Sequence, residues 1–150
     1  MKLAELYPYW NDTHEDFVET VELLTTAQLR AAPYPRAQNI GDLLVQFLFD
    51  ERYYTAHLIG GYVLARPIRE DLKDGRAIAD AMRAAREVTE RVLQPYTREG
   101  LRVVRTLPAD QSINQPETNV TVAWLLWRLL ELELIAWGQV RLRCDDSRHE

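Results

Sequence analysis

The sequence lacks several features on which common protein functions depend. It has a single cysteine, Cys144, so no disulfide can form within the chain, and we expect a reducing compartment, the cytoplasm. Its six glycines form no phosphate-binding loop, and no Gly-x-Ser-x-Gly motif of a serine hydrolase is present. The start of the sequence, Met1–Glu5, has no apolar run that would indicate a signal peptide.

Positive charge is also scarce. Lysine and arginine number 18 against 23 acidic residues, which gives a net charge of −5, and no basic block is present. We therefore expect no binding to nucleic acid or to an anionic membrane surface. The most apolar stretch, 120–140, is interrupted by Arg128, Glu131 and Glu133, so it predicts a buried helix of a water-soluble domain and not a membrane span.

What is present is a composition typical of a globular protein, with 47% hydrophobic and 27% charged residues in 150. We find no internal repeat and no change of composition along the chain. The length is that of one ordinary domain, so we predict a single domain over residues 1–150.

Apolar residues at helical spacing predict four helices and an all-α fold. The predicted first helix contains Trp10, Phe17, Val21 and Leu24, with Pro8 in its first turn or at a kink. A proline-rich connector over 31–36 follows.

The remaining predicted helices are longer. The second spans Ile40–Ala65 with Asn39 as its N-cap, and the third runs from Gly75 to about Pro95. We predict a short extended piece at Leu101–Val104 and a loop over 105–117. The fourth helix spans Asn119–Arg143.

The predicted fourth helix is apolar over most of its circumference, with only a narrow polar stripe. Such a helix must be covered on more than one side. Trp124, Trp127 and Trp137 lie on it, and aromatic side chains are enriched at protein interfaces. The pattern favours either a central position in the bundle or a subunit interface, and we expect a homodimer.

Two segments resemble the DinB/YfiT-like superfamily of four-helix proteins. Residues 39–51 read NIGDLLVQFLFDE, similar to the family motif that opens the second helix. Residues 121–140 read TVAWLLWRLLELELIAWGQV, similar to the family's last helix. The order of the four predicted helices also fits. The resemblance implies a DinB/YfiT-like four-helix bundle, often dimeric, and kinship with metal-dependent thiol transferases and hydrolases that act on small molecules.

The sequence departs from the family where the resemblance places the metal ligands. Gln46 occupies the position of a histidine on the second helix, and Leu132 and Ala136 occupy the positions of two histidines on the fourth. Arg128 replaces a further common histidine. Because Gln46 is a poor transition-metal ligand and the other two cannot coordinate a metal, we expect no metal cofactor.

Glu51 and Glu133 are carboxylates that lie within apolar helix stripes. A buried carboxylate without a partner is costly, so each is expected to be hydrogen-bonded, paired or protonated. One interpretation is a ligand-binding or acid–base pair, and the other is a buried contact that fixes helix packing. Arg128 either fills the former metal site and neutralises Glu51 or Asp50, or lies in solvent beside Glu131.

One flank of the second predicted helix carries Gln46, Asp50, Tyr53 and His57. It either lines a pocket, with His57 as a proton carrier, or is a partly exposed edge. His14 and His57 could form a metal pair only if their helices meet, and no third ligand can be named. His149 is expected on a frayed tail.

These observations lead to a functional hypothesis. We expect a non-catalytic module that binds a small, apolar molecule or a partner protein, with a pocket at the former metal site. The expected pocket residues are Gln46, Asp50, Glu51, His57, Arg128, Leu132, Glu133 and Ala136. The alternative is an enzyme of the superfamily, a thiol transferase or hydrolase that acts with a recruited metal or without one. A purely structural dimer with a filled interior is a third possibility.

Overall fold

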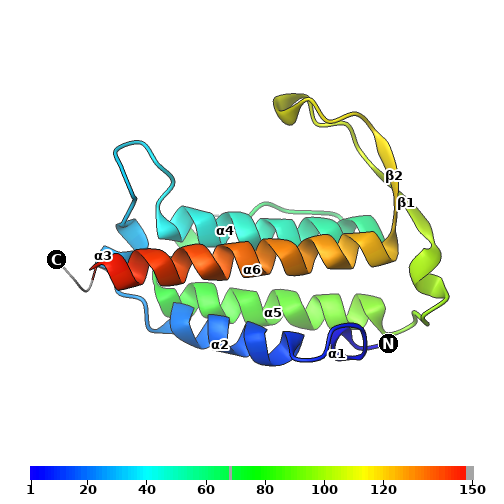
Figure 1. Cartoon of the computed structure of the whole chain (residues 1–150), viewed down its shortest axis with the longest axis horizontal. Coiled ribbons are helices and arrows are strands. Elements are labelled where there is room, and N and C mark those ends of the chain that lie inside the picture. Colours follow the sequence, from blue (N-terminus) through cyan, green and yellow to red (C-terminus); the bar gives the residue numbers. More distant parts are fainter. Residues whose placement is uncertain (68, 148–150) are drawn as a thin grey trace.

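The computed structural model describes residues 1–67 and 69–147. Its four long helical segments lie side by side and form an elongated bundle (Figure 1). Helices α2 (Trp10–Glu22) and α6 (Val122–Ser147) run in one direction, and α4 (Ile40–Glu51) and α5 (Gly75–Leu93) run in the other (Figure 1). His149, expected on a frayed tail, lies outside the described residues.

The segments of regular structure follow one another in this order: α1 (Leu3–Leu6), α2 (Trp10–Glu22), α3 (Thr26–Arg30), α4 (Ile40–Glu51), the π-helix η1 (Arg52–Ile59), the 3₁₀ helix η2 (Arg69–Asp71), α5 (Gly75–Leu93), the 3₁₀ helix η3 (Gly100–Arg102), β1 (Val104–Leu107), the 3₁₀ helix η4 (Gln111–Ile113), β2 (Thr118–Thr121) and α6 (Val122–Ser147).

The first predicted helix is broken near Pro8, as expected. Tyr9 adopts a left-handed backbone conformation with φ of 73°, which separates α1 from α2. The short helix α3 was not predicted from the apolar pattern. It begins with a capping box, in which the hydroxyl of Thr25 accepts a hydrogen bond from the backbone N–H of Gln28 at 3.1 Å.

Helix α4 begins where the sequence predicts, because the side chain of Asn39 accepts a hydrogen bond from the N–H of Asp42 at 2.8 Å. Its predicted end at Ala65 is wrong. The helix continues as the π-helical segment η1 and stops at Ile59. Gly61 then takes a φ of +74°, which turns the chain out of the helix.

Helix α5 matches the prediction from Gly75 to within two residues of Pro95. Gly75 lies against the end of α2. A Cβ atom at this position would overlap the carbonyl oxygen of Val21. The absence of a side chain therefore allows α5 to start close beside α2.

The predicted loop over 105–117 is in part a β-hairpin. Strands β1 and β2 pair antiparallel, with Val104 opposite Thr121 and Leu107 opposite Thr118, and the hairpin projects from one end of the bundle (Figure 1). Of the extended piece predicted at Leu101–Val104, residues 101 and 102 belong to the 3₁₀ helix η3, and Val104 begins β1. The β-branched residues of 103–106 and 118–121 favour the strands. Because β2 holds residues 118–121, α6 starts at Val122 and not at Asn119, and it runs beyond Arg143 to Ser147.

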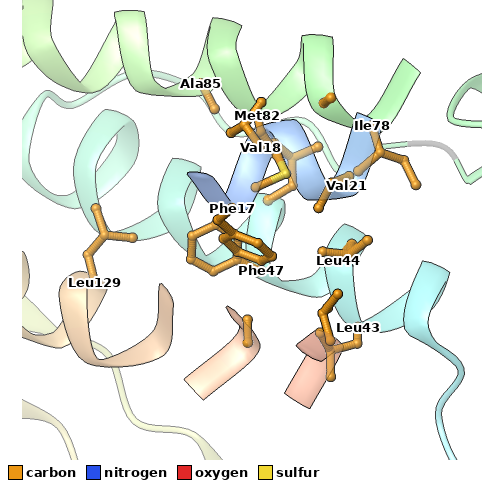
Figure 2. Close-up of a cluster of buried hydrophobic side chains, with 14 of the residues drawn as sticks. Phe17, Val18, Val21, Leu43, Leu44, Phe47, Ile78, Met82, Ala85 and Leu129 are labelled. Atoms are coloured by element: carbon orange, nitrogen blue, oxygen red, sulfur yellow. The ribbon is translucent and has the colours of Figure 1, made fainter. Parts of the chain in front are cut away.

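The core lies between the four long segments. Figure 2 shows Phe17 and Val21 of α2 facing Phe47 and Leu44 of α4, with Met82 of α5 close by. Phe17 also stacks on the indole of Trp137 of α6, with ring centroids 5.2 Å apart. These contacts confirm the helical stripes. Among the described residues, no helix has the length and apolar character needed to cross a membrane.

Candidate functional site

The interior of the bundle holds an ion-pair cluster built from three helices. Glu51 at the end of α4 and Glu133 of α6 are 2% and 0% exposed. The guanidinium of Arg86, from α5, lies between them. Its Nη2 atom lies 2.8 Å from Oε1 of Glu51 and 2.7 Å from Oε2 of Glu133. Arg86 thus joins both carboxylates that the sequence singled out.

Helix α2 supplies two further donors to Glu133. The indole Nε1 of Trp10 donates a hydrogen bond to Oε2 of Glu133, and Nδ1 of His14 is hydrogen-bonded to Oε1. The guanidinium of Arg86 also lies over the indole ring of Trp10, with its Cζ atom 5.1 Å from the centroid of that ring. Because an ionised carboxylate accepts but does not donate, His14 carries its proton on Nδ1 in this arrangement. All four long helices therefore contribute to the cluster.

The surroundings of Glu133 keep it ionised. Burial alone would raise the pKa of this carboxyl, but the hydrogen bond from His14 and the charge of Arg86 outweigh burial and hold the pKa below its ordinary value. For Arg86 burial alone would lower the pKa. The charges of Glu51 and Glu133 reverse this and raise the pKa of the guanidinium.

A pocket of about 750 Å³ opens between α2 and α5, next to the cluster. The two helices lie side by side along the lower edge of the bundle (Figure 1). His14 and Arg86 are the two buried side chains that line the pocket, so they form its floor. The rim is more exposed and consists of Lys2, Asn11, Glu15, Arg83, Glu87, Glu90 and Arg91.

Each floor residue has one polar atom without a partner. Nε2 of His14 and Nη1 of Arg86 are buried and form no hydrogen bond among the described residues. The side chains themselves are only 7% and 8% exposed. Buried polar atoms are nearly always hydrogen-bonded, so these two atoms are exceptions, and both belong to side chains that line the pocket.

The expected pocket residues separate into three groups. Glu51 and Glu133 belong to the buried cluster. Gln46, Asp50, His57 and Arg128 lie on or near the outer side of α4 and η1. Ala136 is buried and Leu132 is partly buried against the hydrophobic core.

The outer flank of α4 is a partly exposed edge with local contacts. The amide of Gln46 donates a hydrogen bond to Asp50 at 2.9 Å. His57 is exposed, its Nδ1 lies 2.8 Å from the carbonyl oxygen of Tyr62, and its ring stacks on Tyr53. Gln46 also lines a smaller pocket, of about 220 Å³, together with Asp42 and other residues. The structure does not bring His57 to the buried cluster.

The interpretation that Arg128 neutralises Glu51 is wrong, because Arg86 occupies that role. Arg128 instead forms an ion pair with Glu131, 2.6 Å away and one helical turn along α6. Both side chains are about one-third exposed. Arg128 does act on Asp50. Burial raises the pKa of Asp50, while the hydrogen bond from Gln46 and the charge of Arg128 partly offset this rise.

The residues at the three positions implied as metal ligands do not fit a transition-metal ion. Gln46 offers only an amide oxygen, a poor ligand for such an ion, while its amide nitrogen donates to Asp50, and Leu132 and Ala136 have no atom that can coordinate a metal. His14 and His57 do not form the alternative pair, because one is buried against Glu133 and the other is exposed. Across the described ranges 1–67 and 69–147, no group of three or more His, Cys, Asp or Glu side chains is arranged to hold a metal.

Sequence reasoning missed Arg86, His14 and Trp10 as members of the cluster. A signal for two of them was present. Arg86 follows Met82 by four residues on the apolar stripe of α5, and His14 precedes Phe17 by three on that of α2. A charged or polar residue within an apolar stripe is the same signal that identified Glu51 and Glu133.

The comparison with known proteins finds a similar fold but no similar sequence. No protein-family model matches the sequence, and neither does any curated protein. The structure is similar to that of a DinB-like protein from Bacillus cereus, with a TM-score of 0.77 and 14% sequence identity. The similarity covers 97% of this chain and 92% of that chain. The chain therefore has the fold of DinB-like proteins, which confirms the predicted four-helix architecture and adds the small hairpin to it.

Proposed function

We propose that this chain is a non-catalytic, DinB-like protein that binds a small molecule in the pocket between α2 and α5. The main support for this proposal is the pocket of about 750 Å³. Its floor is formed by the buried side chains of His14 and Arg86, each of which has a polar atom without a partner among the described residues. A concave pocket of this size with a few buried polar groups is the usual location of a small-molecule site. The predicted pocket at Gln46, Leu132 and Ala136 is less favoured, because Leu132 and Ala136 pack against the core.

The chemistry of the cluster supports a binding role over a catalytic one. Glu133 accepts hydrogen bonds from Trp10, His14 and Arg86, which take up three of its about four lone-pair sites and favour the ionised form. A general base needs a free lone pair within reach of a substrate proton. The family's metal-dependent chemistry requires a metal to activate a thiol or water, and the residues at 46, 132 and 136 do not fit that ion.

A ligand screen with a pocket-filling variant tests this proposal. Thermal unfolding is followed in a panel of small carboxylates, amines, polyols, thiols and hydrocarbons, and binders raise the melting temperature. Asn11→Trp fills the pocket from its exposed rim on α2 and should abolish the shift. Glu19→Trp is the matched control, because Glu19 is exposed on the same helix but does not line the pocket. A shift that persists in Asn11→Trp contradicts this location.

Elemental analysis distinguishes the proposed binding function from the alternative, a metal-dependent enzyme. We propose that the protein as purified contains no stoichiometric transition metal. A metal bound one per chain, together with thiol-transfer or hydrolytic activity that chelation removes, would support a metal-dependent enzyme instead.

We also propose that the protein acts as a cytoplasmic homodimer. The support for the compartment is the single cysteine. The support for the dimer is the outer side of α6, where Trp127, Leu134, Ile135 and Leu142 are 47%, 49%, 47% and 64% exposed. Apart from its chain neighbours and the backbone of its own helix, no atom of the described residues lies within 4 Å of where a Cβ of Gly138 would be, which leaves the middle of this face open to a second helix. A second copy of the chain offers the same apolar face in a two-fold arrangement.

A further inference from the structure

The outer face of α6, a helix that runs the length of the bundle (Figure 1), carries two rows of residues with a period of seven. Trp127, Leu134 and Arg141 form one row. Glu131 and Gly138 form the other, four residues after Trp127 and Leu134. The side chain of Glu131 is 35% exposed, and the other four residues are exposed. Alternating steps of four and three are the spacing of the two contact rows of a coiled coil.

Gly138 leaves a space in the middle of this face. A glycine in the interior of a helix is unfavourable relative to alanine. Within the described ranges, no other element and no side chain comes within 4 Å of a Cβ placed at this position, so packing inside one chain does not require the glycine. The space suits a large apolar side chain from another molecule, because such a side chain can approach the helix backbone closely.

The charges on the face differ between its two ends. Glu131 pairs with Arg128 at 2.6 Å, and the charge of Arg128 also acts on Asp50, so two carboxylates share one cation. Arg141 lies ten residues further along α6, with its guanidinium Cζ 5.3 Å from the ring centroid of Trp137. A face with a carboxylate-rich end and a cationic end complements a second copy of itself when the two copies run in opposite directions.

We propose that α6 packs against α6 of a second copy in an antiparallel pair, with the two-fold axis level with residue 136; this inference rests on the proposed homodimer. The register places Leu134 opposite Gly138 of the second copy, where the leucine fills the space at the glycine. The same register places Glu131 opposite Arg141 of the second copy. Both pairs are centred on residue 136, so one axis satisfies the apolar contact and the ion pair together.

A parallel arrangement of the same face is less favourable. In a parallel two-fold pair each of these residues meets its own copy, so Glu131 faces Glu131 and Arg141 faces Arg141. Like charges placed together oppose association. Two copies of Gly138 would also face each other and leave the space unfilled. The charges and the glycine therefore favour the same antiparallel direction.

Charge reversal in the full chain tests the register. Glu131→Arg and Arg141→Glu each place like charges opposite one another, so each should raise the Kd of the dimer about tenfold or more. The two substitutions combined in one chain bring opposite charges together again and should recover most of that loss. Glu19→Arg is the matched control, because it makes the same change of charge at an exposed position of α2 and should leave the Kd unchanged. Sedimentation equilibrium measures each Kd.

Cysteine cross-linking measures the direction of the helices independently. Glu131→Cys and Arg141→Cys are each made in a chain that also carries Cys144→Ala, and a short bis-maleimide is added. In the antiparallel pair an equimolar, exchanged mixture of the two variants should cross-link. Each variant alone should not, because identical positions are separated by ten residues of helix, about 15 Å. A parallel pair gives the opposite result.

The outcomes distinguish this inference from the homodimer on which it rests. A dimer that neither single charge reversal weakens overturns the antiparallel register, while the homodimer stands. Cross-linking of each cysteine variant with itself, and not in the mixture, has the same consequence. If the unaltered chain is a monomer, including a monomer that uses this face to bind a different protein, both the register and the homodimer are wrong.

Discussion

Arg86 donates a hydrogen bond to Glu133 at 2.7 Å in the interior of the bundle, although the two residues are 47 positions apart in the sequence. The same guanidinium contacts Glu51 of α4 through Nε at 2.8 Å. Two carboxylates, which would otherwise repel each other in a medium of low polarity, are thereby held in place by one cation. The cluster links the end of α4 to α5 and α6, and through Trp10 and His14 to α2, so we expect it to stabilise the packing of all four helices.

Replacing Arg86 by methionine should destabilise the protein strongly. The variant leaves Glu51 and Glu133 buried without their cation, and removing one partner of a buried ion pair costs about 3–5 kcal/mol. Urea unfolding measures the loss. Arg83→Met is the control, since Arg83 is about one-third exposed on the same helix and its surface ion pairs contribute at most about 1 kcal/mol. Equal losses in the two variants would contradict the central role of Arg86.

Removing all three charges should restore much of that stability. In the combined variant of Arg86→Met, Glu51→Met and Glu133→Met no buried charge remains, and apolar replacement of a whole buried ion cluster is often neutral or stabilising. The triple variant is therefore expected to be more stable than Arg86→Met alone. If it is less stable, the packing around the cluster matters more than its charges.

The dependence of the free energy of unfolding on pH should reflect the lowered pKa of Glu133. Its folded-state pKa is lowered, so the unfolded state binds the proton more readily. The stability that this residue contributes is present above the ordinary glutamate pKa, about 4.3, and is lost as the pH falls through the lower folded value. We expect the free energy of unfolding to drop below about pH 4.3 in the unaltered chain, with a shallower drop in Glu133→Gln. Equal slopes would contradict this.

The stability that Asp50 contributes should depend on pH in the opposite direction from that of Glu133. Burial raises its folded-state pKa, so the folded state holds the proton more tightly, and the corresponding stability is present at low pH and lost as the pH rises through the folded value. Asp50→Asn should therefore gain stability relative to the unaltered chain as the pH rises above the ordinary aspartate pKa, about 3.9, towards the raised folded-state value. Chemical denaturation at several pH values checks the sign.

Arg128 should affect the pKa of Asp50 but have little effect on the free energy of unfolding. Its positive charge favours the ionised form of Asp50, so Arg128→Gln should raise the pKa of Asp50 further, which carbon-detected NMR titration measures directly. Its ion pair with Glu131 is partly exposed, so the free energy of unfolding should change by less than about 1 kcal/mol. A loss of several kcal/mol would show that a buried carboxylate depends on Arg128.

Much of the fold follows from local patterns in the sequence. The stripe around Phe17 and Val21, the N-cap at Asn39 and the start of α5 at Gly75 were all predicted, because each depends on residues a few positions apart. The end of the second helix and the hairpin were not. The strand residues near Val104 and Val120 pair with each other across a long loop, and helical periodicity carries no information on such pairing.

The candidate site was predicted in part for the same reason. A charge within an apolar stripe is visible in a sequence, so Glu51 and Glu133 were identified as buried groups in need of partners. The identity of the partner depends on which helices are adjacent and in what register. The position of Arg86 on the apolar stripe of α5 is visible in the sequence, but only the three-dimensional packing shows that it meets Glu51 and Glu133. The packing also shows that Arg128 pairs along α6 with Glu131.

The outer face of α6 yields the last prediction, that a second copy of the chain covers it. Leu134 is 49% exposed near the middle of this face. Leu134→Lys places a charge where an apolar interface is expected, and its desolvation opposes association. Sedimentation equilibrium should give twice the 17.5 kDa chain mass for the unaltered protein and a single chain mass for the variant. Leu23→Lys is the matched control, because Leu23 is 81% exposed at the end of α2, away from this face, and the variant should remain dimeric. If the unaltered chain sediments as a monomer, the exposed tryptophan and leucines of α6 face solvent or a different protein, and the dimer proposal is wrong.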